Sequence, residues 1–461
     1  MFEKILQQFH EDMQKALAHA TQMLQEQIDF GGVEQELAHL LDNLATEVLT
    51  GLLNDHLRSP EFLVQAKTVA SQHGLRFKGY REVSVYLSTG QRVRVMSPYF
   101  LPKQKKRGRK KRGPNGRGRH LGLELLGFIK RGSPNFVNEV VKLAVLCPSL
   151  AITKEVLKDR RIQVNVTTIR RYCRDLGAVG LADRGAISVQ PDEDLAGQTL
   201  VVSLDGGRVR KRKRKRGRKK HGQRRQGYTT PWKEPLLFTL YALDADGTMS
   251  TTFTPVYDAT MGDYDACFAL LRRYLRALPV HSARRIVFTG DGARWIWPRV
   301  EALIAEFGFA AEQVRQVLDY AHAVGNLHEI VTLLPSPKQA RTFRAWKPLL
   351  FQGKIDELGT AIRGALTGKK QKQGLKKWRN YFQRNATRMQ YADCQQQHLP
   401  CGSGHVESAI RRVINLRLKA PGTFWTTAMA EVFLFLRSQL LSGRWQIFLT
   451  NATRQLADTL T

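Results

Sequence analysis

Five short apolar segments in the second half of the chain most constrain its fold, because each has the pattern of a buried strand. They are TLVVSLD (199–205), PLLFTLYALD (235–244), MSTTFTPVYD (249–258), RIVFTGD (285–291) and RQVLDY (315–320). The residues near 262–278 and 294–307 have helical spacing, and DADG at 244–247 predicts a hairpin turn between the second and third strands. The sequence therefore predicts a mixed α/β sheet in the order strand, strand, strand, helix, strand, helix, strand.

This order is that of the RNase H-like fold, in which the first, third and fourth strands run one way and the second runs back. Asp205 and Asp291 would then lie at the carboxyl ends of adjacent strands, where open α/β sheets place their ligands. A glycine follows each aspartate, which allows a sharp turn that leaves the carboxylate exposed. Asp244 and Asp246 would lie at the opposite end as turn residues. Asp258 is a weaker fourth candidate on the site's side.

Two carboxylates at neighbouring strand ends, with a third from a later helix, can hold two Mg²⁺ ions for in-line attack at a phosphodiester. Mg²⁺ prefers oxygen ligands and keeps several of its waters, and Mn²⁺ can substitute for it. The strand pattern itself does not identify the third acid.

The N-terminal part of the chain is predicted to be an all-α region that contains a helix-turn-helix. Residues 1 to about 75 carry leucines at helical spacing, which indicates amphipathic helices for packing or self-association. Two alternating segments on either side of residues 88–90 nevertheless predict a β-hairpin there.

Residues 135–177 have the pattern of three helices, at 135–146, 152–159 and 166–177, the last capped by Asn165 and ended by Gly177. The third helix would direct four residues inward: Ile169, Tyr172, Cys173 and Leu176. It would leave outside the residue types that reach base edges and phosphates in a DNA groove: Thr167, Thr168, Arg170, Arg171 and Arg174. Ordinary three-helix packing gives a similar pattern.

The charge of the chain predicts a polyanionic partner. The 461 residues include 73 Lys and Arg against 40 Asp and Glu, a formal net charge of +33, which makes double-stranded DNA the expected partner. No run is long and apolar enough to span a membrane, and the five cysteines are too scattered for a disulfide framework. We expect a cytoplasmic, nucleoid-associated protein.

Two segments concentrate the positive charge. Ten of the seventeen residues from Lys103 to Arg119 are basic, among them Lys106, Arg109 and Lys110, and they predict a flexible arm that becomes ordered on phosphates, or else a solvated linker. Thirteen of the eighteen residues from Arg208 to Arg225 are basic and include five predicted DNA contacts: Arg210, Lys211, Arg212, Arg214 and Arg216. Since this loop joins the first strand to its antiparallel neighbour, it leaves the sheet at the same end as Asp205.

Four segments resemble bacterial insertion-sequence transposases of the DDE type, in the Mutator-like group. They are VSLDGGRV, FTGDGARWIW, VLDYAHAVGNL and GSGHVESAIRRVINLRLKAPGTFW, and LRSQLLSGRW follows them. The resemblance extends in order from residue 199 to about 446. It implies that Asp205, Asp291 and Glu407 are the catalytic, metal-binding acids, and that Asp319 and His322 are the Asp/Cys-x-x-His signature of the group.

Further residues near Glu407 fit this expectation. Ser403 could cap a helix whose N-terminus favours phosphate, and Arg411 and Arg412 could bind the DNA backbone one turn later. Glu431 is a weaker alternative for the glutamate because its surroundings are apolar. A structural role for His322 also stays open.

Residues 323–400 are predicted to be a helical, basic insertion of the kind this family places before its glutamate. Trp346 and Trp378 could stack on an unpaired base, but core packing is the favoured interpretation of each. Four residues have zinc-ligand chemistry but not a familiar zinc spacing: Cys394, His398, Cys401 and His405.

The sequence thus predicts seven regions. They are 1–100, a helical region with a β-hairpin; 101–125, a basic arm; 126–185, a helix-turn-helix DNA-binding domain; 195–322, the first part of the catalytic core; 323–400, a helical insertion; 401–446, the second part of the core; and 447–461, a C-terminal tail.

The predicted function is metal-dependent cleavage at element ends and strand transfer into target DNA, by a homodimer or larger assembly on DNA. Two alternatives stay open. One is an RNase H-like DNA nuclease or resolvase that uses the same acids without strand transfer. The other is a non-catalytic DNA-binding regulator derived from a transposase.

Overall fold

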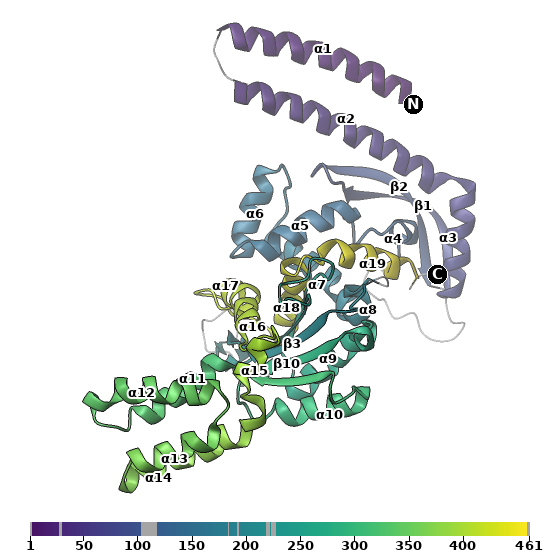
Figure 1. Cartoon of the computed structure of the whole chain (residues 1–461). Helices are drawn as coiled ribbons and strands as arrows, with labels where there is room; N and C mark the ends of the chain where they lie inside the picture. Colours follow the sequence, from purple (N-terminus) through teal and green to yellow (C-terminus); the bar gives the residue numbers. More distant parts are fainter. Residues whose placement is uncertain are drawn as a thin grey trace. The chain divides into compact units, whose positions relative to one another are not determined.

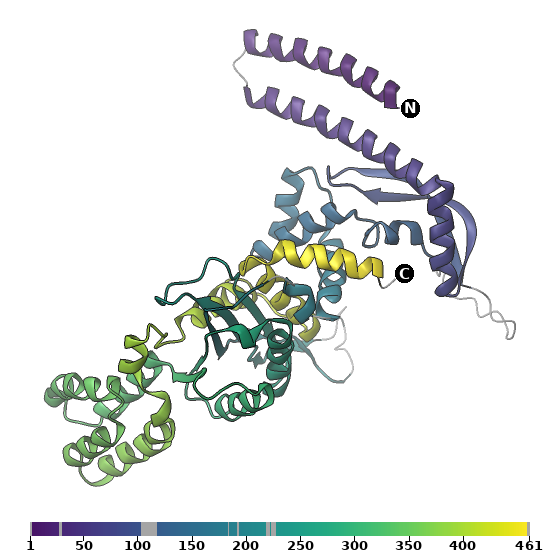
Figure 2. The ribbon, with the colours of Figure 1, turned by 45° about the vertical axis from the view of Figure 1, so that its right-hand side comes forward.

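The computed structural model describes residues 2–26, 30–102, 118–182, 184–190, 193–217, 222 and 227–458. The chain divides into two compact units, one formed by residues 1–179 with 449–461 and the other by residues 180–448. Figures 1 and 2 show the ribbon in two views. No helix in the described part of the chain has the length and apolarity needed to cross a membrane.

The first unit opens with three helices, α1 (Phe2–Glu26), α2 (Phe30–Arg58) and α3 (Pro60–Gln72). Helices α1 and α2 lie side by side (Figure 1). A long antiparallel hairpin follows, formed by β1 (Leu75–Tyr86) and β2 (Arg92–Pro102). The predicted helices and hairpin are confirmed. The description of this region as all-α is wrong, because a two-stranded sheet forms part of its core and buries Val83, Val85 and Val95.

A group of shorter helices completes this unit: α4 (Leu121–Leu125), α5 (Pro134–Leu146), α6 (Leu150–Asp159) and α7 (Val166–Ala182). Asn165 accepts a hydrogen bond from the Thr168 backbone N–H (2.8 Å), as predicted for a helix cap. The four residues predicted to face inward on α7 are buried. The predicted end at Gly177 is wrong, because Gly177 is buried within the helix and α7 continues to Ala182.

A five-stranded mixed sheet forms the centre of the second unit. Its strands are β3 (Thr199–Gly206), β8 (Leu236–Leu243), β9 (Val256–Thr260), β10 (Arg285–Gly290) and β11 (Val314–Leu318). Their order across the sheet is β11-β10-β3-β8-β9. Strands β3, β10 and β11 are parallel, and β8 is antiparallel to both of its neighbours, β3 and β9. The predicted mixed α/β sheet is confirmed.

Helices cover both faces of this sheet. Phe238 and Tyr241 of β8 are three residues apart, so their side chains point to opposite faces. The Phe238 ring packs against Tyr274 of α9 (Tyr264–Ala277), and the Tyr241 ring stacks on His405 of α16 (Gly404–Ala409). The α16 segment therefore lies across the face opposite α9.

The basic loop between β3 and β8 contains a narrow β-ribbon. Its base pairs β4 (Val209–Arg210) with β7 (Trp232–Lys233), and its outer part pairs β5 (Lys213–Arg214) with β6 (Tyr228–Thr229). The part of the predicted loop that the structure describes therefore forms this ordered ribbon.

The remaining elements of the second unit are helical. Before the insertion they are α8 (Arg184–Ser188), η1 (Val280–Ser282) and α10 (Trp297–Phe307). The insertion comprises α11 (Tyr320–Val331), α12 (Ser336–Phe351), α13 (Ile355–Ala365), α14 (Gly368–Lys377), a π-turn η2 (Trp378–Phe382), a 3₁₀ turn η3 (Gln383–Arg388) and α15 (Tyr391–Gln396). After α16 come the π-turn η4 (Ile410–Asn415), α17 (Leu416–Leu418), α18 (Thr427–Leu441) and α19 (Trp445–Asp458), of which α19 passes into the first unit.

The predicted helical insertion is confirmed, and it extends away from the sheet in both views (Figures 1 and 2). Trp346 and Trp378 both belong to the buried core, and the Trp378 indole N–H donates to the Ile355 carbonyl (2.9 Å). Core packing is therefore the correct interpretation of these two tryptophans.

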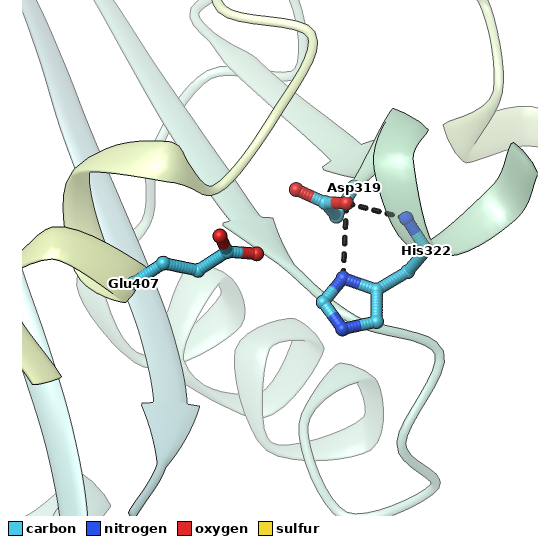
Figure 3. Close-up of side chains that lie close together, drawn as sticks. All are labelled: Asp319, His322 and Glu407. Atoms are coloured by element: carbon cyan, nitrogen blue, oxygen red, sulfur yellow. Dashed lines mark hydrogen bonds and ion pairs between the residues drawn. The ribbon is translucent and has the colours of Figure 1, made fainter. Parts of the chain in front are cut away.

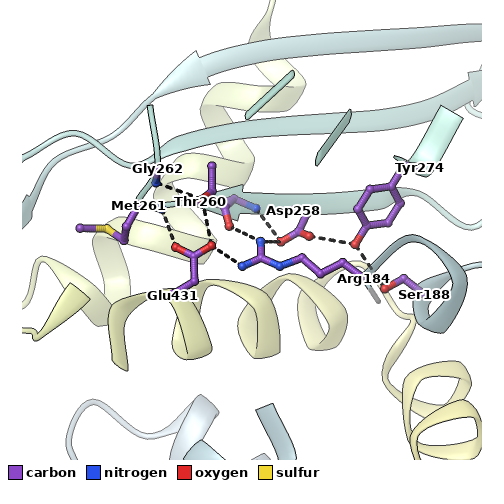
Figure 4. Close-up of polar contacts among 9 residues, drawn as sticks. Arg184, Ser188, Asp258, Thr260, Met261, Gly262, Tyr274 and Glu431 are labelled. Carbon is purple, nitrogen blue, oxygen red and sulfur yellow. Dashed lines mark hydrogen bonds and ion pairs between the residues drawn. The ribbon is translucent and has the colours of Figure 1, made fainter. Parts of the chain in front are cut away.

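Buried ionic contacts join α8, β9 and α18 (Figure 4). The Arg184 guanidinium contacts Asp258 (3.2 Å) and Glu431, and it donates to the Ala259 carbonyl (2.9 Å). The Tyr274 hydroxyl donates to the other Asp258 oxygen (2.9 Å). Because Asp258 lies inside β9 with no exposed surface, its suggested place at the site was wrong. Glu431 has a structural role as well, since its carboxylate accepts from Met261 and Arg184.

Replacing Arg184 by Met should destabilise the second unit, because the Asp258 carboxylate would be left buried without its cation. We expect a loss of about 3–5 kcal/mol in the free energy of unfolding, measured by urea denaturation. Arg272→Met is the matched control. Its partner Glu306 is about one-third exposed, and such a pair contributes only about 0–1 kcal/mol. Equal losses in the two variants would contradict the structural role of Arg184.

Candidate active site at the carboxyl ends of the central strands

Asp205 and Asp291 lie on adjacent parallel strands at the same edge of the sheet. The register pairs Leu204 of β3 with Gly290 of β10, so Asp205 near the end of β3 and Asp291 directly after β10 are each the next residue along the chain. One oxygen of Asp205 accepts from the Gly206 backbone N–H (2.6 Å), and one oxygen of Asp291 accepts from that of Ala293 (2.9 Å). These bonds fix each carboxylate through one oxygen.

Asp319 and His322 lie at the end of the next strand, β11, as the three-residue spacing predicts. Asp319 is the N-cap of α11, and its Oδ1 accepts from both the backbone N–H (2.7 Å) and the ring Nδ1 (2.9 Å) of His322. Figure 3 shows the Asp319 carboxylate against the imidazole, with Glu407 directed toward the pair from α16. Ligand-type atoms of these three residues lie within 4.8 Å of one another.

The second oxygen of Asp319 holds the segment that carries Glu407. Asp319 Oδ2 accepts from both the backbone N–H and the hydroxyl (2.6 Å) of Ser403. The next backbone contact, Tyr320 N–H to the Cys401 carbonyl (2.9 Å), strengthens the same junction. Both carboxylate oxygens of Asp319 are thus used within the protein, and its side chain is almost fully buried.

Ser403 therefore does not act as predicted. It occupies the N-cap position of α16, but its side chain makes no capping hydrogen bond because the hydroxyl donates to Asp319 instead. The backbone N–H of Glu407 bonds to the Ser403 carbonyl (3.1 Å), which places the glutamate in the first turn of α16. Its side chain is exposed.

The electrostatics of the site are those of crowded carboxylates beside one cationic histidine. Burial raises the pKa of Asp205 to about 6, and repulsion from Asp291 and Glu407 adds to this effect. The hydrogen bond that the His322 ring donates to Asp319 raises the pKa of His322 to about 9, and the charges of Asp319, Asp291 and Asp205 raise it further. Burial works against ionisation of Asp319, but hydrogen bonds from His322 and Ser403 lower its pKa well below the ordinary value.

The donor set fits a hard divalent cation. Asp205 and Asp291 each have one oxygen without a hydrogen bond among the described contacts, and Glu407 is exposed and lies near enough to raise the pKa of Asp205. A cation would relieve the mutual repulsion that raises the pKa of Asp205. Carboxylate oxygens are the ligands that Mg²⁺ and Mn²⁺ prefer. The hydrogen bonds that saturate Asp319 leave it better suited to positioning than to coordination.

Two residues of the helical insertion also reach this site, and sequence reasoning missed both. The Tyr381 ring packs so closely on Gly292 that a β-carbon there would lie 2.3 Å from it. Burial raises the pKa of the Tyr381 hydroxyl, and the charges of Asp291 and Asp319 raise it further. Arg384 donates to the Gly292 carbonyl (3.0 Å). No local pattern marks these residues, since only the return of the insertion brings them beside Asp291.

The predicted DNA-binding residues fall into separate groups. Arg210, Arg212, Arg214 and Arg216 are exposed on the ribbon beyond Asp205, and Lys211 is partly buried. Arg411 is exposed on η4, four residues after Glu407. Arg412 is partly engaged, because it donates to the Tyr257 hydroxyl (2.9 Å) and packs over that ring.

On α7 in the first unit, Thr167, Arg170, Arg171 and Arg174 are exposed and Thr168 is partly exposed, as the helical pattern predicts. Arg174 also forms an ion pair with Asp175. The remaining predicted contacts, Lys106, Arg109 and Lys110, lie outside the described residues.

The four possible zinc ligands do not assemble. Cys394 is buried, the Cys401 thiol donates to the Tyr391 carbonyl (3.5 Å), and His405 stacks on Tyr241. Within the described ranges, the group of metal-ligating side chains is that of Asp319, His322 and Glu407.

No protein-family model matches the sequence, and no curated protein matches it. Among solved structures, the chain is similar to one titled "Drosophila P element transposase strand transfer complex", with 12% sequence identity and a TM-score of 0.26. That match covers 69% of this chain and 81% of the other. A superposition this loose does not establish a shared fold, so the function of this chain rests on its own residues.

The Asp319–His322 pair predicts a pH dependence that NMR can measure. His322 keeps its proton to a pKa of about 9 in the folded, metal-free protein, whereas the ordinary value is 6.5. The stability contributed by this pair should therefore be fully present below pH 6.5 and lost as the pH rises through 9. In Asp319→Asn, the ring nitrogen titration of His322 should move down toward 6.5.

Asp393→Asn is the matched control, because Asp393 lies beside Arg315 and does not contact His322. Its His322 titration should be that of the wild type. An unchanged titration in Asp319→Asn would contradict the electrostatic description of the site.

Proposed function

We propose that this chain is a DNA transposase that cleaves element ends and joins them to target DNA by metal-dependent phosphoryl transfer. The observation that carries the proposal is that acids from neighbouring elements lie close enough for Asp291 and Glu407 to raise the pKa of Asp205, while the ligand atoms within 4.8 Å of one another are those of Asp319, His322 and Glu407. Asp205 and Asp291 follow adjacent parallel strands, Glu407 arrives on α16, and Asp319 fixes α16 to the end of β11. The basic ribbon begins beside the first of these acids.

The proposal includes an RNase H-like core with a helical insertion. The strand order β11-β10-β3-β8-β9, with β8 antiparallel and the other four strands parallel to one another, supports this assignment. The three helices α5 to α7 are proposed as a helix-turn-helix whose third helix carries exposed Thr and Arg side chains.

The site residues have distinct proposed roles. Asp205, Asp291 and Glu407 would hold the metal, and Asp319 would position both Glu407 and His322. Two divalent cations, Mg²⁺ or Mn²⁺, would stabilise negative charge on the phosphodiester when bound. His322, protonated below its pKa of about 9, can donate a hydrogen bond to a phosphate oxygen or to the departing oxygen.

The chemistry balances without a covalent protein–DNA link. Water attacks the scissile phosphorus, the bond to the 3′ oxygen breaks, and that oxygen takes up a proton as the 3′-hydroxyl leaves. In the joining step this hydroxyl attacks a phosphodiester of the target strand and displaces a new 3′-hydroxyl there. We propose double-stranded DNA as the partner of a homodimer or larger assembly, in the cytoplasm at the nucleoid.

Cleavage and joining of DNA that carries the element's own ends would test the proposal. Wild-type protein with Mg²⁺ should give both products, and EDTA should abolish them. Glu407→Gln and Asp205→Asn should each reduce the rate by more than the roughly 10- to 100-fold that is lost when a residue that only hydrogen-bonds to a metal ligand is removed.

The matched control is Asp246→Asn, because Asp246 is an exposed turn residue at the far end of the sheet. It should cleave at the wild-type rate. Cleavage without joining would favour a nuclease or resolvase, and binding without cleavage in any protein would favour a regulator.

The exposed arginines of α7 give a separate prediction for DNA affinity. Arg170→Gln and Arg171→Gln should each weaken duplex binding and reduce the slope of log K against log salt by about 0.9, because one phosphate contact is lost. The measurement is fluorescence anisotropy at several salt concentrations. Arg272→Gln, whose partner is Glu306, is the control and should keep the wild-type slope. Unchanged slopes in both α7 variants would remove α7 from the DNA interface.

A further inference from the structure

The basic ribbon exposes aromatic rings as well as charge. Trp232 of β7 is 51% exposed and Tyr228 of β6 is 39% exposed, and each faces a basic residue across the ribbon, Arg210 and Arg214 respectively. The nearby Phe424 is 36% exposed and its ring lies 5.7 Å from that of Tyr228. Exposed tryptophan is unusual, because its large apolar surface is normally buried in a core or an interface.

Arginines pack over both ribbon rings. The Arg210 guanidinium lies 5.0 Å from the centre of the Trp232 ring, and that of Arg212 lies 4.3 Å from the centre of the Tyr228 ring. Such packing holds the rings in place while much of their surface stays exposed. The sequence from Gly206 to Lys233 contains no Asp or Glu, so the ribbon carries a strong excess of positive charge between Asp205 and Glu234.

The ribbon is fixed to the segment that carries Glu407. The Arg212 backbone N–H donates to the Trp425 carbonyl (2.7 Å), and the Trp425 N–H donates to the Arg210 carbonyl (3.0 Å). The Trp425 indole in turn donates to the carbonyl of Leu418, the last residue of α17 (3.0 Å). The ribbon thus starts four residues after Asp205 and is hydrogen-bonded to the segment that follows Glu407.

A two-stranded ribbon has marginal stability by itself and gains little from displaying aromatic rings to water. Rings held between basic side chains are, however, the arrangement that binds single-stranded nucleic acid. The rings stack on bases, and the cations neutralise phosphates of the same strand. In a duplex each base is already stacked between its neighbours, so an aromatic face gains most from a base that is unpaired.

We propose that Trp232 and Tyr228 form a stacking platform for unpaired bases of the DNA strand next to the cleaved phosphate. The proposal rests on the proposed function in taking DNA as the ligand, and it adds a preference for unpaired nucleotides at this surface. Arg210 and Arg212 hold the rings and neutralise the strand's phosphates. The platform would keep a frayed strand end beside Asp205 and Glu407 during cleavage and joining.

Binding of the full-length protein to three DNA probes, measured by fluorescence anisotropy, tests the platform. The probes are a duplex, the same duplex with a short unpaired end, and a single strand of equal length, in EDTA and in the Glu407→Gln background so that catalysis plays no part. Relative to that background, Trp232→Ala and Tyr228→Ala should each weaken binding to the single strand and the frayed duplex by about 5- to 100-fold. Binding to the full duplex should stay within about threefold, because the arginines remain.

Three further variants separate stacking from charge and from folding. Trp232→Phe keeps an aromatic face and should retain most of the affinity for the single strand and the frayed duplex. Trp232→Leu keeps only an apolar side chain and should lose that affinity. Phe30→Ala removes a ring that is 60% exposed on α2 in the other unit and should change no affinity. The salt slope should be the same in Trp232→Ala as in the parent, since no charge is lost.

If Trp232→Ala and Tyr228→Ala lost affinity equally for all three probes, or lost none for any of them, the platform would be overturned while the proposed function stayed intact. If the parent protein bound none of the probes, both the platform and the proposed function would fail. Selective loss on the unpaired probes, restored by Trp232→Phe, is the outcome that the platform requires.

Discussion

The buried carboxylate of Asp319 is the contact on which the site depends. One of its oxygens orients the His322 ring and keeps it protonated. The other oxygen accepts from Ser403 and so holds the start of the α16 segment. Strand β11 and α16 are separated by the whole helical insertion, and this side chain joins the two ends of the insertion together with the backbone bond from Tyr320 to Cys401. Glu407 follows four residues after Ser403, so this bond contributes to its position relative to Asp205 and Asp291, as does the stacking of His405 on Tyr241 of β8.

The charges of the site are balanced in a way that favours an added cation. Burial and neighbouring acids make ionisation of Asp205 unfavourable, while the hydrogen-bonded His322 stays protonated close by. A divalent cation would stabilise the carboxylates without removing the histidine as a hydrogen-bond donor. The electrostatics differ from those of a purely structural cluster of acids, in which each carboxylate would have a basic partner, as Asp258 has in Arg184, and this difference is one reason for the proposed function.

Buried arginines keep the surrounding framework in place. Arg184 joins β9 to α18 through Asp258 and Glu431, and Arg437 of α18 donates to the Val413 carbonyl (2.9 Å) within the π-turn that follows Glu407. Removing Arg184 would leave the buried Asp258 carboxylate without its cation, which costs far more than loss of a surface pair. The site is thus built on contacts that tolerate little change in the residues around them.

The sequence by itself determined four of the strands to within about two residues and the two aspartates at the ends of β3 and β10, because apolar segments ending in Asp-Gly encode both burial and a sharp turn out of the sheet. It placed the third strand at 249–258, whereas β9 is Val256–Thr260. It also determined the hairpin, the Asn165 cap and the inward face of α7, which depend on local spacing. Only the tertiary structure decided that Ser403 bonds to Asp319 instead of capping α16, that Asp258 lies buried inside β9, and that Tyr381 packs beside Asp291. These outcomes depend on residues brought together across long separations in the chain, and local propensity carries no information about which distant partner will satisfy a buried polar group.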